Sequence, residues 1–332
     1  MKQSRGGTRI IGKPSKISLP NKPLVSIVTA CLNSEKYLEQ TIQSVLGQTY
    51  DNIEYIIVDG GSTDKTLDII RKYEEYIAYW VSEPDKGLYD AMNKGVSFTD
   101  GEWIGIINSD DFYAEDTVKW VVEAARTDKE AQLFCGNISV LNSRECADPR
   151  ACREYQGRPG NLLKEMNFFQ PTWFVSREIY AKLKFNINFK FAADWDFAIK
   201  LYLDNIKLGY INESLVYFRP NGISSSFSAR REIDQIKTFC GMLCLPFMTR
   251  AAAKKSLEIG RPSFGLLFLN NTLQIFPLLH NILKTALKLT LANIHPKLTR
   301  GAAGKYRKKL HDLLTKLSKL FKAFFYRYGQ NR

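Results

Sequence analysis

Apolar and polar residues alternate in blocks along the first 115 residues, and the block lengths predict strands and helices in turn. Short apolar runs rich in β-branched residues predict buried strands. They occupy residues 24–30, 53–58, 77–82 and 103–107. Residues 35–46 and 88–97 carry apolar side chains at helical spacing, and a further helix is expected to begin at Thr63 or Asp64. This alternation predicts an α/β fold with a doubly wound, mostly parallel sheet.

Beyond residue 115 the pattern is looser. It predicts strands at about 132–140 and 214–218, an extended stretch at 167–175, and helices at about 194–204 and 229–244. We therefore divide the chain into a basic N-terminal tail (1–22), a main α/β domain (23–228) and a helical C-terminal region (229–332).

The net charge of +13 is confined to the two ends of the chain. Residues 1–23 hold six Lys or Arg and no acid, and residues 297–332 hold eleven basic residues and one acid. Residues 24–296 carry 30 basic and 33 acidic residues. Basic ends on a mildly acidic domain are typical of contact with an anionic surface, so we expect no nucleic-acid partner.

The cysteines and histidines exclude several classes of protein. Six cysteines without CxxC spacing indicate reduced thiols in a cytoplasmic protein, and no signal peptide is visible. The histidines are His280, His295 and His311. Chemistry in the main domain must therefore use a carboxylate base, which excludes Ser-His-Asp hydrolysis and a His-rich zinc site there.

The strongest candidate for chemistry is Asn108-Ser109-Asp110-Asp111, directly after a predicted strand. Crowded carboxylates repel one another unless a cation lies between them, and oxygen ligands without His or Cys favour Mg²⁺ or Mn²⁺. A solvated turn with a helix-capping Asp is an equally weighted alternative. In open α/β sheets the ligand lies beyond the carboxyl ends of the strands, which is where this cluster is predicted.

Three further polar clusters are individually ambiguous. Residues 59–66 place two glycines at a strand-to-helix turn, where a backbone can approach a ligand closely, but a structural turn is equally compatible. Residues 83–95 form a polar turn and a short helix, which suits phosphate contacts or a plain capped helix. Asp194 and Asp196 open a helix, either as favourable charges at its N-terminus or with one of them as a general base. No GxGxxG follows a strand, which disfavours a nicotinamide-dependent oxidoreductase.

Taken together, these stretches resemble the bacterial glycosyltransferase family two, which has the GT-A fold. The resemblance covers about residues 24–220, and it is closest to the branch that builds O-antigen, capsule and exopolysaccharide units. The matching text comprises VSIVTACLNSEKYLEQTIQSVLGQTYDNIEYIIVDGGSTDKT, SEPDKGLYDAMNKG, GEWIGIINSDD, QPTWFVSREIY and FAADWDFAIKL.

The resemblance implies a single in-line displacement that inverts the anomeric centre, with a nucleotide-sugar donor (a UDP-sugar is favoured). Asp194 matches the catalytic base, and Asp110 with Asp111 matches the motif that holds Mn²⁺ or Mg²⁺ against the donor diphosphate. The implied donor side comprises Ala30, Asn33, Asp59, Gly60, Ser62, Asp85, Lys86, Gly87, Asn93, Asn108 and Ser109. The implied acceptor side comprises Gln170, Trp173 and Trp195.

The sequence departs from the family pattern at two positions. Asn108 stands where many relatives carry the first Asp of the acidic motif, and Gly60 stands where many carry a second Asp. The metal is therefore expected to depend on fewer carboxylates. No QxxRW follows the base, which argues against a processive polymerase.

The C-terminal region predicts contact with a membrane. From about 305 to 328, Leu, Phe and Tyr follow helical spacing opposite a Lys/Arg face, the pattern of a basic amphipathic helix that lies on an anionic membrane surface. A helix docked on the main domain is the alternative. Residues 262–283 carry no formal charge but are too polar to predict a spanning helix. We expect a peripheral protein at the inner face of the plasma membrane, with a lipid-linked or other saccharide acceptor.

Two other functions are compatible with parts of the sequence. A nucleotide-sugar pyrophosphorylase shares the fold class, but it should carry a Gly-rich, Arg-containing loop after the first strand, where this chain reads Ala30-Cys31-Leu32-Asn33. A non-catalytic membrane-bound scaffold with a degenerate transferase domain is suggested by Asn108 and Gly60.

Overall fold

A computed structural model describes residues 4–146, 148–160, 166, 168–220, 232–234 and 236. The chain divides into two units, Met1–Glu258 and Ile259–Arg332. All described residues belong to the first unit. The stretch 262–283 and the amphipathic helix predicted over about 305–328 lie outside the described residues.

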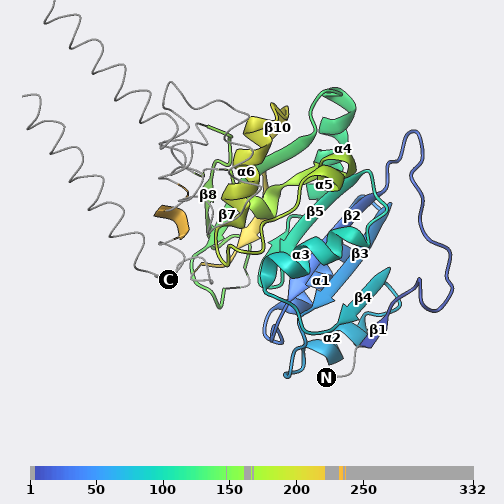
Figure 1. Ribbon diagram of the computed structural model, residues 1–332. Coiled ribbons are helices and arrows are strands. Elements are labelled where there is room, and N and C mark those ends of the chain that lie inside the picture. Colours follow the sequence, from blue (N-terminus) through green and yellow to red (C-terminus); the bar gives the residue numbers. More distant parts are fainter. Residues whose placement is uncertain are drawn as a thin grey trace, which may run out of the picture. The chain divides into compact units, whose positions relative to one another are not determined.

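The first half of the main domain is a parallel sheet, as predicted (Figure 1). The strands β4 (Tyr79–Ser82), β3 (Ile53–Asp59), β2 (Val25–Cys31) and β5 (Trp103–Asn108) lie side by side in this order and are all parallel. Every residue of β2 is buried. Because β2 is covered on both faces, its residues are mostly apolar, and the buried hydroxyls of Ser26 and Thr29 are hydrogen-bonded to Glu54 and Tyr55.

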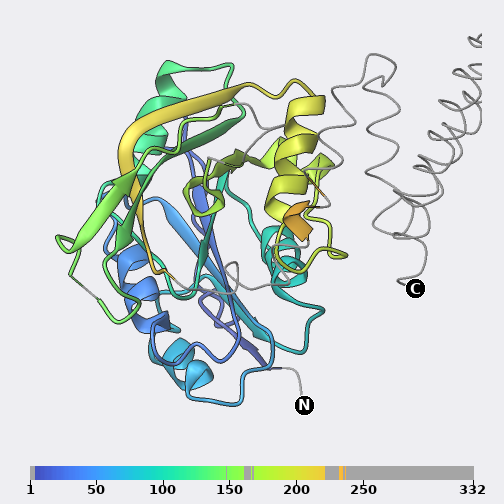
Figure 2. The same cartoon turned by 90° about the vertical axis from the view of Figure 1, so that its left-hand side faces the viewer.

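Successive side chains of these strands point to opposite faces of the sheet. Ile27 of β2 and Ile57 of β3 belong to one cluster with α1 (Leu38–Leu46), α2 (Thr66–Lys72) and α4 (Thr117–Thr127). On the other face, Gly95 of α3 (Leu88–Ser97) lies so close to Val28 and Val58 that an added Cβ would meet them at 2.3 and 3.3 Å. Figure 2 shows α1 and α2 on one side of the sheet and α3 on the other.

The second half of the sheet is mixed. The strand β9 (Phe174–Ser176) runs antiparallel between β5 and β7 (Leu133–Leu141), and β10 (Leu208–Phe218) runs parallel to β7. Two short antiparallel strands, β6 (Phe112–Tyr113) and β8 (Cys152–Tyr155), complete this half. Parallel pairing is therefore confirmed for the predicted βα units, whereas most antiparallel ladders of the described strands lie beyond residue 110.

Several predicted elements differ in extent. The stretch 167–175 contains a short 3₁₀ helix (Gln170–Thr172) before β9, and the strand expected at 214–218 begins six residues earlier. Beyond residue 115 the described α-helices include α4, α5 (Arg177–Lys182) and α6 (Ala193–Leu203). Of these three helices, α6 alone was predicted. Of the helix expected at 229–244, residues 232–234 and 236 are described, and they are helical.

The N-terminal residues, expected as a tail, lie against the main domain from residue 4 onward. The strand β1 (Ser4–Gly6) pairs antiparallel with β4 at the sheet edge. Arg9 forms ion pairs with the buried Glu54 and with Asp100. Part of the basic charge near the N-terminus is thereby neutralised within the fold.

Among the described helices, none is long and apolar enough to cross a membrane.

Candidate active site

The carboxyl ends of three parallel strands meet at one edge of the sheet. Ala30 pairs with Asn108 of β5, and its neighbour Cys31 pairs with Asp59 of β3. The loops that follow these strands are therefore adjacent in space. They carry most residues of the predicted donor side, although Ala30 itself is buried in β2.

Asp59 holds the loop after β3. Its carboxylate has no exposed surface and accepts hydrogen bonds from the backbone N–H groups of Gly61 (3.2 Å) and Ser62 (3.0 Å). It also accepts from the hydroxyls of Ser62 and Ser82, the latter at 2.6 Å. Gly61 adopts a φ of +86°, which glycine tolerates best. Asp59 thus fixes the shape of this loop from within.

Asn33 joins the loops after β2 and β3. Its backbone N–H donates to Ser62 Oγ (2.7 Å), and its Oδ1 accepts from the N–H of Thr63 (3.0 Å). Ser34 continues the junction, because its N–H donates to Thr66 Oγ1 at 2.7 Å. These bonds make the two loops one surface.

Gly60 leaves room for a carboxylate from another loop. An added Cβ at Gly60 would lie 2.5 Å from Asp85 Oδ2, which belongs to the turn between β4 and α3. Asp85 in turn accepts from the N–H of Gly87 at 2.7 Å, and the N–H of Lys86 donates to Asp90. Burial raises the pKa of Asp85. The chain thus places the Asp85 carboxylate beside the position where many relatives carry an Asp.

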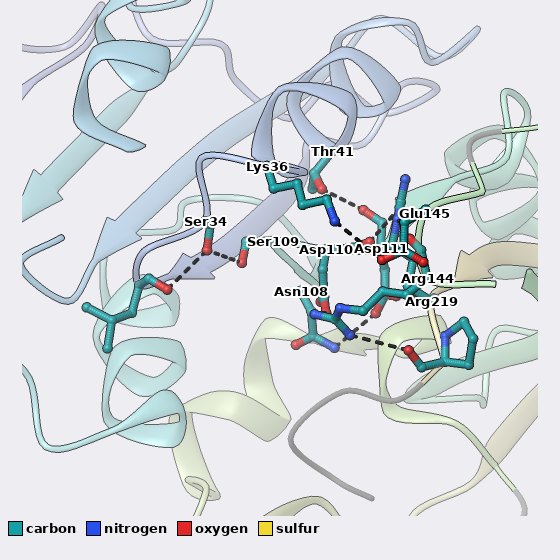
Figure 3. A network of polar contacts seen from close by, with 12 residues as sticks. Ser34, Lys36, Thr41, Asn108, Ser109, Asp110, Asp111, Arg144, Glu145 and Arg219 are labelled. Atoms are coloured by element: carbon teal, nitrogen blue, oxygen red, sulfur yellow. Dashed lines mark hydrogen bonds and ion pairs between the residues drawn. The ribbon is translucent and has the colours of Figure 1, made fainter. Parts of the chain in front are cut away.

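The acidic motif divides into two unlike carboxylates (Figure 3). Asp111 is 1% exposed, and its oxygens accept from the backbone N–H of Arg219 (2.9 Å) and from Asn108 Nδ2 (3.2 Å). Burial, followed by the neighbouring Asp110, raises the pKa of Asp111 to about 8. The Asp110 side chain is 27% exposed. Only Asp110 therefore presents a carboxylate to a ligand.

Basic side chains from distant parts of the chain surround Asp110 (Figure 3). Arg144 Nη2 lies 2.8 Å from Asp110 Oδ2, and Arg219 Nη1 donates to the backbone oxygen of Asp110 at 2.6 Å. Both guanidinium groups lie over the Tyr37 ring, at 5.4 and 4.5 Å from its centroid. Lys36 lies over the same ring at 5.0 Å. Cation–π contacts of this kind stabilise positive charge, so the Tyr37 ring helps to gather three cationic side chains beside Asp110.

Ser109 belongs to the same edge of the sheet. Its hydroxyl lies 2.7 Å from Ser34 Oγ, so the acidic motif is joined to the loop after β2 (Figure 3). The predicted donor residues of three loops are therefore connected through side-chain contacts.

Asp194 lies in the first turn of α6 and is partly exposed. Its Oδ1 accepts from the backbone N–H of Trp195 (2.9 Å) and from Tyr89 Oη (3.4 Å), which belongs to α3. Burial raises the pKa of Asp194 to about 6, although both hydrogen bonds lower it. Asp196, by contrast, is 1% exposed, with Lys200 Nζ at 2.7 Å. Of these two carboxylates, only Asp194 is placed to meet a substrate.

The predicted acceptor-side residues lie beneath the surface. Trp173 has no exposed surface and stacks against Phe168 and Phe197. Gln170 and Trp195 are 6% and 4% exposed, and Gln170 Nε2 donates to the oxygen of Ile106. They are therefore core residues, and the structure does not present their side chains as exposed contacts for an acceptor.

Asn93 is not brought to the donor loops. Both ends of its side-chain amide bond the backbone of Phe185, at 2.8 and 3.0 Å. Asn93 therefore ties α3 to the chain between α5 and α6, on the side of Asp194.

Arg144, Arg219 and Tyr89 were missed as candidates from the sequence. Arg144 lies in a loop after β7 and Arg219 directly follows β10, more than 30 and 100 residues from Asp110. No local pattern distinguishes an arginine that crosses to a site from one in solvent. The position of Arg219 directly after a strand was the one available signal.

A divalent cation can use Asp110 as a single protein carboxylate. No group of three or more His, Cys, Asp or Glu side chains forms a metal site in the part of the chain that the structure describes. Asp111 is buried and engaged within the protein, whereas the Asp110 carboxylate is partly exposed and bonded by Arg144 at Oδ2. It is of the hard-oxygen type that Mn²⁺ and Mg²⁺ prefer. The residues therefore fit a cation whose remaining ligands come from the donor and water.

Comparisons with known proteins identify the family of this chain. Residues 26–183 match the family model Glycosyl transferase family 2. A PGL/p-HBAD biosynthesis glycosyltransferase of Mycobacterium bovis is 30% identical over 193 residues, which cover 54% of this chain and 70% of the relative. Glycosyltransferase GlyG of Streptococcus pneumoniae is 28% identical over 214 residues, 59% of this chain and 70% of the relative.

Two solved structures share the fold. S. aureus TarS 1-349 in complex with UDP-GlcNAc aligns with a TM-score of 0.54 at 20% identity, covering 70% of each chain. The mannosyltransferase PcManGT of Pyrobaculum calidifontis, in complex with GDP-Man and Mn²⁺, aligns with a TM-score of 0.51 at 19% identity, covering 80% of this chain and 85% of that chain. The predicted GT-A fold is confirmed. The chain belongs to glycosyl transferase family 2 and is a glycosyltransferase.

Proposed function

We propose that this enzyme transfers a sugar from a nucleotide-diphosphate sugar, with a UDP-sugar favoured, to a hydroxyl group of a saccharide acceptor, with inversion at the anomeric carbon. The observation that carries the proposal is the placement of Asp194, whose carboxylate is partly exposed in the first turn of α6 and accepts hydrogen bonds from Trp195 and Tyr89. Burial raises the pKa of this carboxyl to about 6. A carboxylate with this pKa is ionised at neutral pH, yet is a stronger base than an exposed Asp, as deprotonation of a hydroxyl requires.

Asp194 and the donor loops are linked through α3. Tyr89 of this helix donates to Asp194, and the turn before the helix carries Asp85 beside Gly60. In the proposed reaction, Asp194 accepts the proton of the acceptor hydroxyl. The oxygen of that hydroxyl attacks the anomeric carbon from the face opposite the leaving nucleotide diphosphate. A single displacement of this kind needs one base and inverts the centre.

The donor diphosphate is proposed to lie beside Asp110. Arg144, Arg219 and Lys36 supply positive charge there, which stabilises the developing charge of the leaving group. Asp110 would hold Mn²⁺ or Mg²⁺; such an ion adds Lewis-acid stabilisation of the same diphosphate. The Asn33, Gly60 and Ser62 surface, shaped by Asp59, is proposed to receive the nucleoside.

Asp194→Asn tests the assignment of the base. We expect transfer to fall by about a hundredfold to ten-thousandfold, since general-base catalysis contributes on the order of 10² to 10⁴. Donor binding should be retained, measured by calorimetry with UDP. Because folding raises the pKa of Asp194, its ionised form destabilises the fold at pH values above that pKa. The neutral Asn removes this effect, so at pH 8 the melting temperature of Asp194→Asn should equal or exceed that of the wild type. Sustained turnover would eliminate Asp194 as the base.

Asp110→Asn tests the cation. Adding Mn²⁺ should strengthen UDP binding by the wild type but not by the variant, because the amide is a poor ligand for a hard divalent cation. Asp116→Asn, an exposed carboxyl that bonds Thr49, is the matched control. Equal Mn²⁺ enhancement in Asp110→Asn and wild type would contradict the assignment.

We further propose that the acceptor is lipid-linked, that the enzyme acts in cell-surface polysaccharide synthesis of the O-antigen or capsule type, and that it works at the cytoplasmic face of the membrane. The amphipathic, basic sequence over about 305–328 supports this location. Screening UDP-, GDP- and dTDP-sugars for donor hydrolysis, with and without Mn²⁺, identifies the donor.

A further inference from the structure

The loop that leads into α6 is held by a carboxylate from far along the chain. Glu232 is 4% exposed, and its carboxylate accepts hydrogen bonds from three consecutive backbone N–H groups. These belong to Lys190 (3.0 Å to each oxygen), Phe191 (2.8 Å) and Ala192 (3.2 Å). The helix that carries Asp194 begins at the next residue, Ala193.

This contact holds the backbone directly before α6. The N-cap residue is Ala192, whose side chain has no oxygen, and the helix has no side-chain cap hydrogen bond. The N–H groups at a helix start have no partner within the helix, and an uncompensated buried donor is costly. A carboxylate at this end also interacts favourably with the helix dipole. Glu232 therefore satisfies the N–H of the N-cap residue Ala192 and of the two residues before it, whereas the N–H of Trp195 in the first turn bonds the Asp194 carboxylate.

The same carboxylate places negative charge close to Asp194. Two titratable side chains from outside α6 act on the base: Tyr89 from α3, and Glu232. Within α6, the Asp196 carboxylate is paired with Lys200. Tyr89 donates a hydrogen bond that favours the ionised Asp194, whereas the charge of Glu232 favours its protonated form.

We infer that Glu232 is a positioning residue for the base: it fixes the loop directly before the helix that carries Asp194, and it adds negative charge near that carboxylate. The inference rests on the proposed role of Asp194. Glu232 touches neither donor nor acceptor in this scheme, so its substitution should change kcat and its pH dependence rather than the KM for the donor.

The experiment compares the pH profiles of kcat/KM for Glu232→Gln and Glu232→Asp in the full-length enzyme. Turnover is followed as UDP release from whichever of UDP-glucose, UDP-galactose or UDP-N-acetylglucosamine the wild type uses. Glu178→Gln, an exposed Glu in the first turn of α5, is the matched control. Thermal melting of each variant verifies folding.

Removing a negative charge lowers the pKa of a neighbouring carboxyl, so the base ionises at lower pH. In Glu232→Gln the acid limb of the profile should therefore move down by about half a pH unit. Its kcat should fall about tenfold, because a neutral amide is a weaker acceptor than a carboxylate for the N–H groups of residues 190–192, and the loop before α6 is then held less firmly. Glu232→Asp keeps the charge, so its acid limb should stay at the wild-type position.

An acid limb and kcat that are unchanged in Glu232→Gln would overturn the inference, as would an acid limb that moves equally in Glu232→Gln and Glu232→Asp. Asp194→Asn separates this result from a failure of the proposed function. If Asp194→Asn is inactive while Glu232→Gln behaves as wild type, only the role of Glu232 is refuted. If Asp194→Asn remains active, the base assignment is refuted and the inference with it.

Discussion

At the scale of single residues, the two departures from the family pattern have structural counterparts. A Cβ added at Gly60 would lie beside the Asp85 carboxylate. The Asn108 amide donates a hydrogen bond to Asp111, whereas an Asp at position 108 would repel the Asp111 carboxylate. Both positions lie beside a carboxylate that the protein itself supplies. A side chain with negative charge at either position would add a like charge within a few ångströms, which is unfavourable without a cation between.

Gly60→Ala tests this account of the donor loop. The added Cβ would lie 2.5 Å from Asp85 Oδ2, closer than any stable contact, so Asp85 or the loop must move. We expect UDP binding to weaken by about tenfold, which corresponds to about 1.4 kcal/mol. The control is Gly47→Ala at the exposed end of α1, where φ is −84°. Wild-type affinity in Gly60→Ala would show that Asp85 does not shape the donor site.

At the scale of elements, the acidic motif is held by loops that no local pattern connects. The loop after β5 carries Asp110, the loop after β7 carries Arg144, and Arg219 stands at the end of β10. The guanidinium of Arg219 also donates to the backbone oxygen of Arg144 at 3.0 Å, which joins the two arginines. The mixed half of the sheet therefore supplies both arginines beside Asp110, and the parallel half supplies Lys36.

Arg144→Gln tests whether this charge serves the diphosphate. UDP binding should weaken by about tenfold, as loss of one charge-assisted contact implies, whereas uridine binding should not change. Arg150→Gln, an exposed arginine that pairs with Asp148 in the same connection, is the control. An equal loss of UDP and uridine affinity would indicate disruption of the loop rather than loss of a phosphate contact.

At the scale of the whole molecule, charge is divided between a mildly acidic catalytic part and basic ends. Near the N-terminus, part of the basic charge is neutralised by ion pairs, which join Arg9 to Glu54 and Asp100, and Lys22 to Asp51. The basic residues between 305 and 328 remain, from sequence, the proposed contact with an anionic membrane.

Reversing four of these charges in the full chain tests that contact. The variant carries Glu at Lys308, Lys309, Lys316 and Lys319. Binding to phosphatidylglycerol vesicles should weaken by at least about tenfold, at roughly 1 kcal/mol for each basic residue near the surface. The control has the same change of charge at four exposed lysines outside the C-terminal region. These are Lys13, Lys129, Lys182 and Lys184. Equal binding by variant and control would refute the assignment of the C-terminal region.

The sequence by itself determined the parallel half of the fold and the position of the candidate chemistry. Residues 24–108 were predictable because each strand and helix there is defined by a local period, and because parallel strands bring their carboxyl ends to one edge. The clusters at Asp59 and Asp110 followed from that rule. The family resemblance added Asp194, which periodicity alone could not separate from Asp196.

Only the tertiary structure decided which of these side chains are available and what holds them. It buried Asp111 and Asp196 and left Asp110 and Asp194 partly exposed, although each pair is nearly adjacent in sequence. It also brought Arg144, Arg219 and Glu232 to positions where they bond these loops. Burial and charge pairing depend on contacts between residues tens to hundreds of positions apart, and no local pattern encodes them.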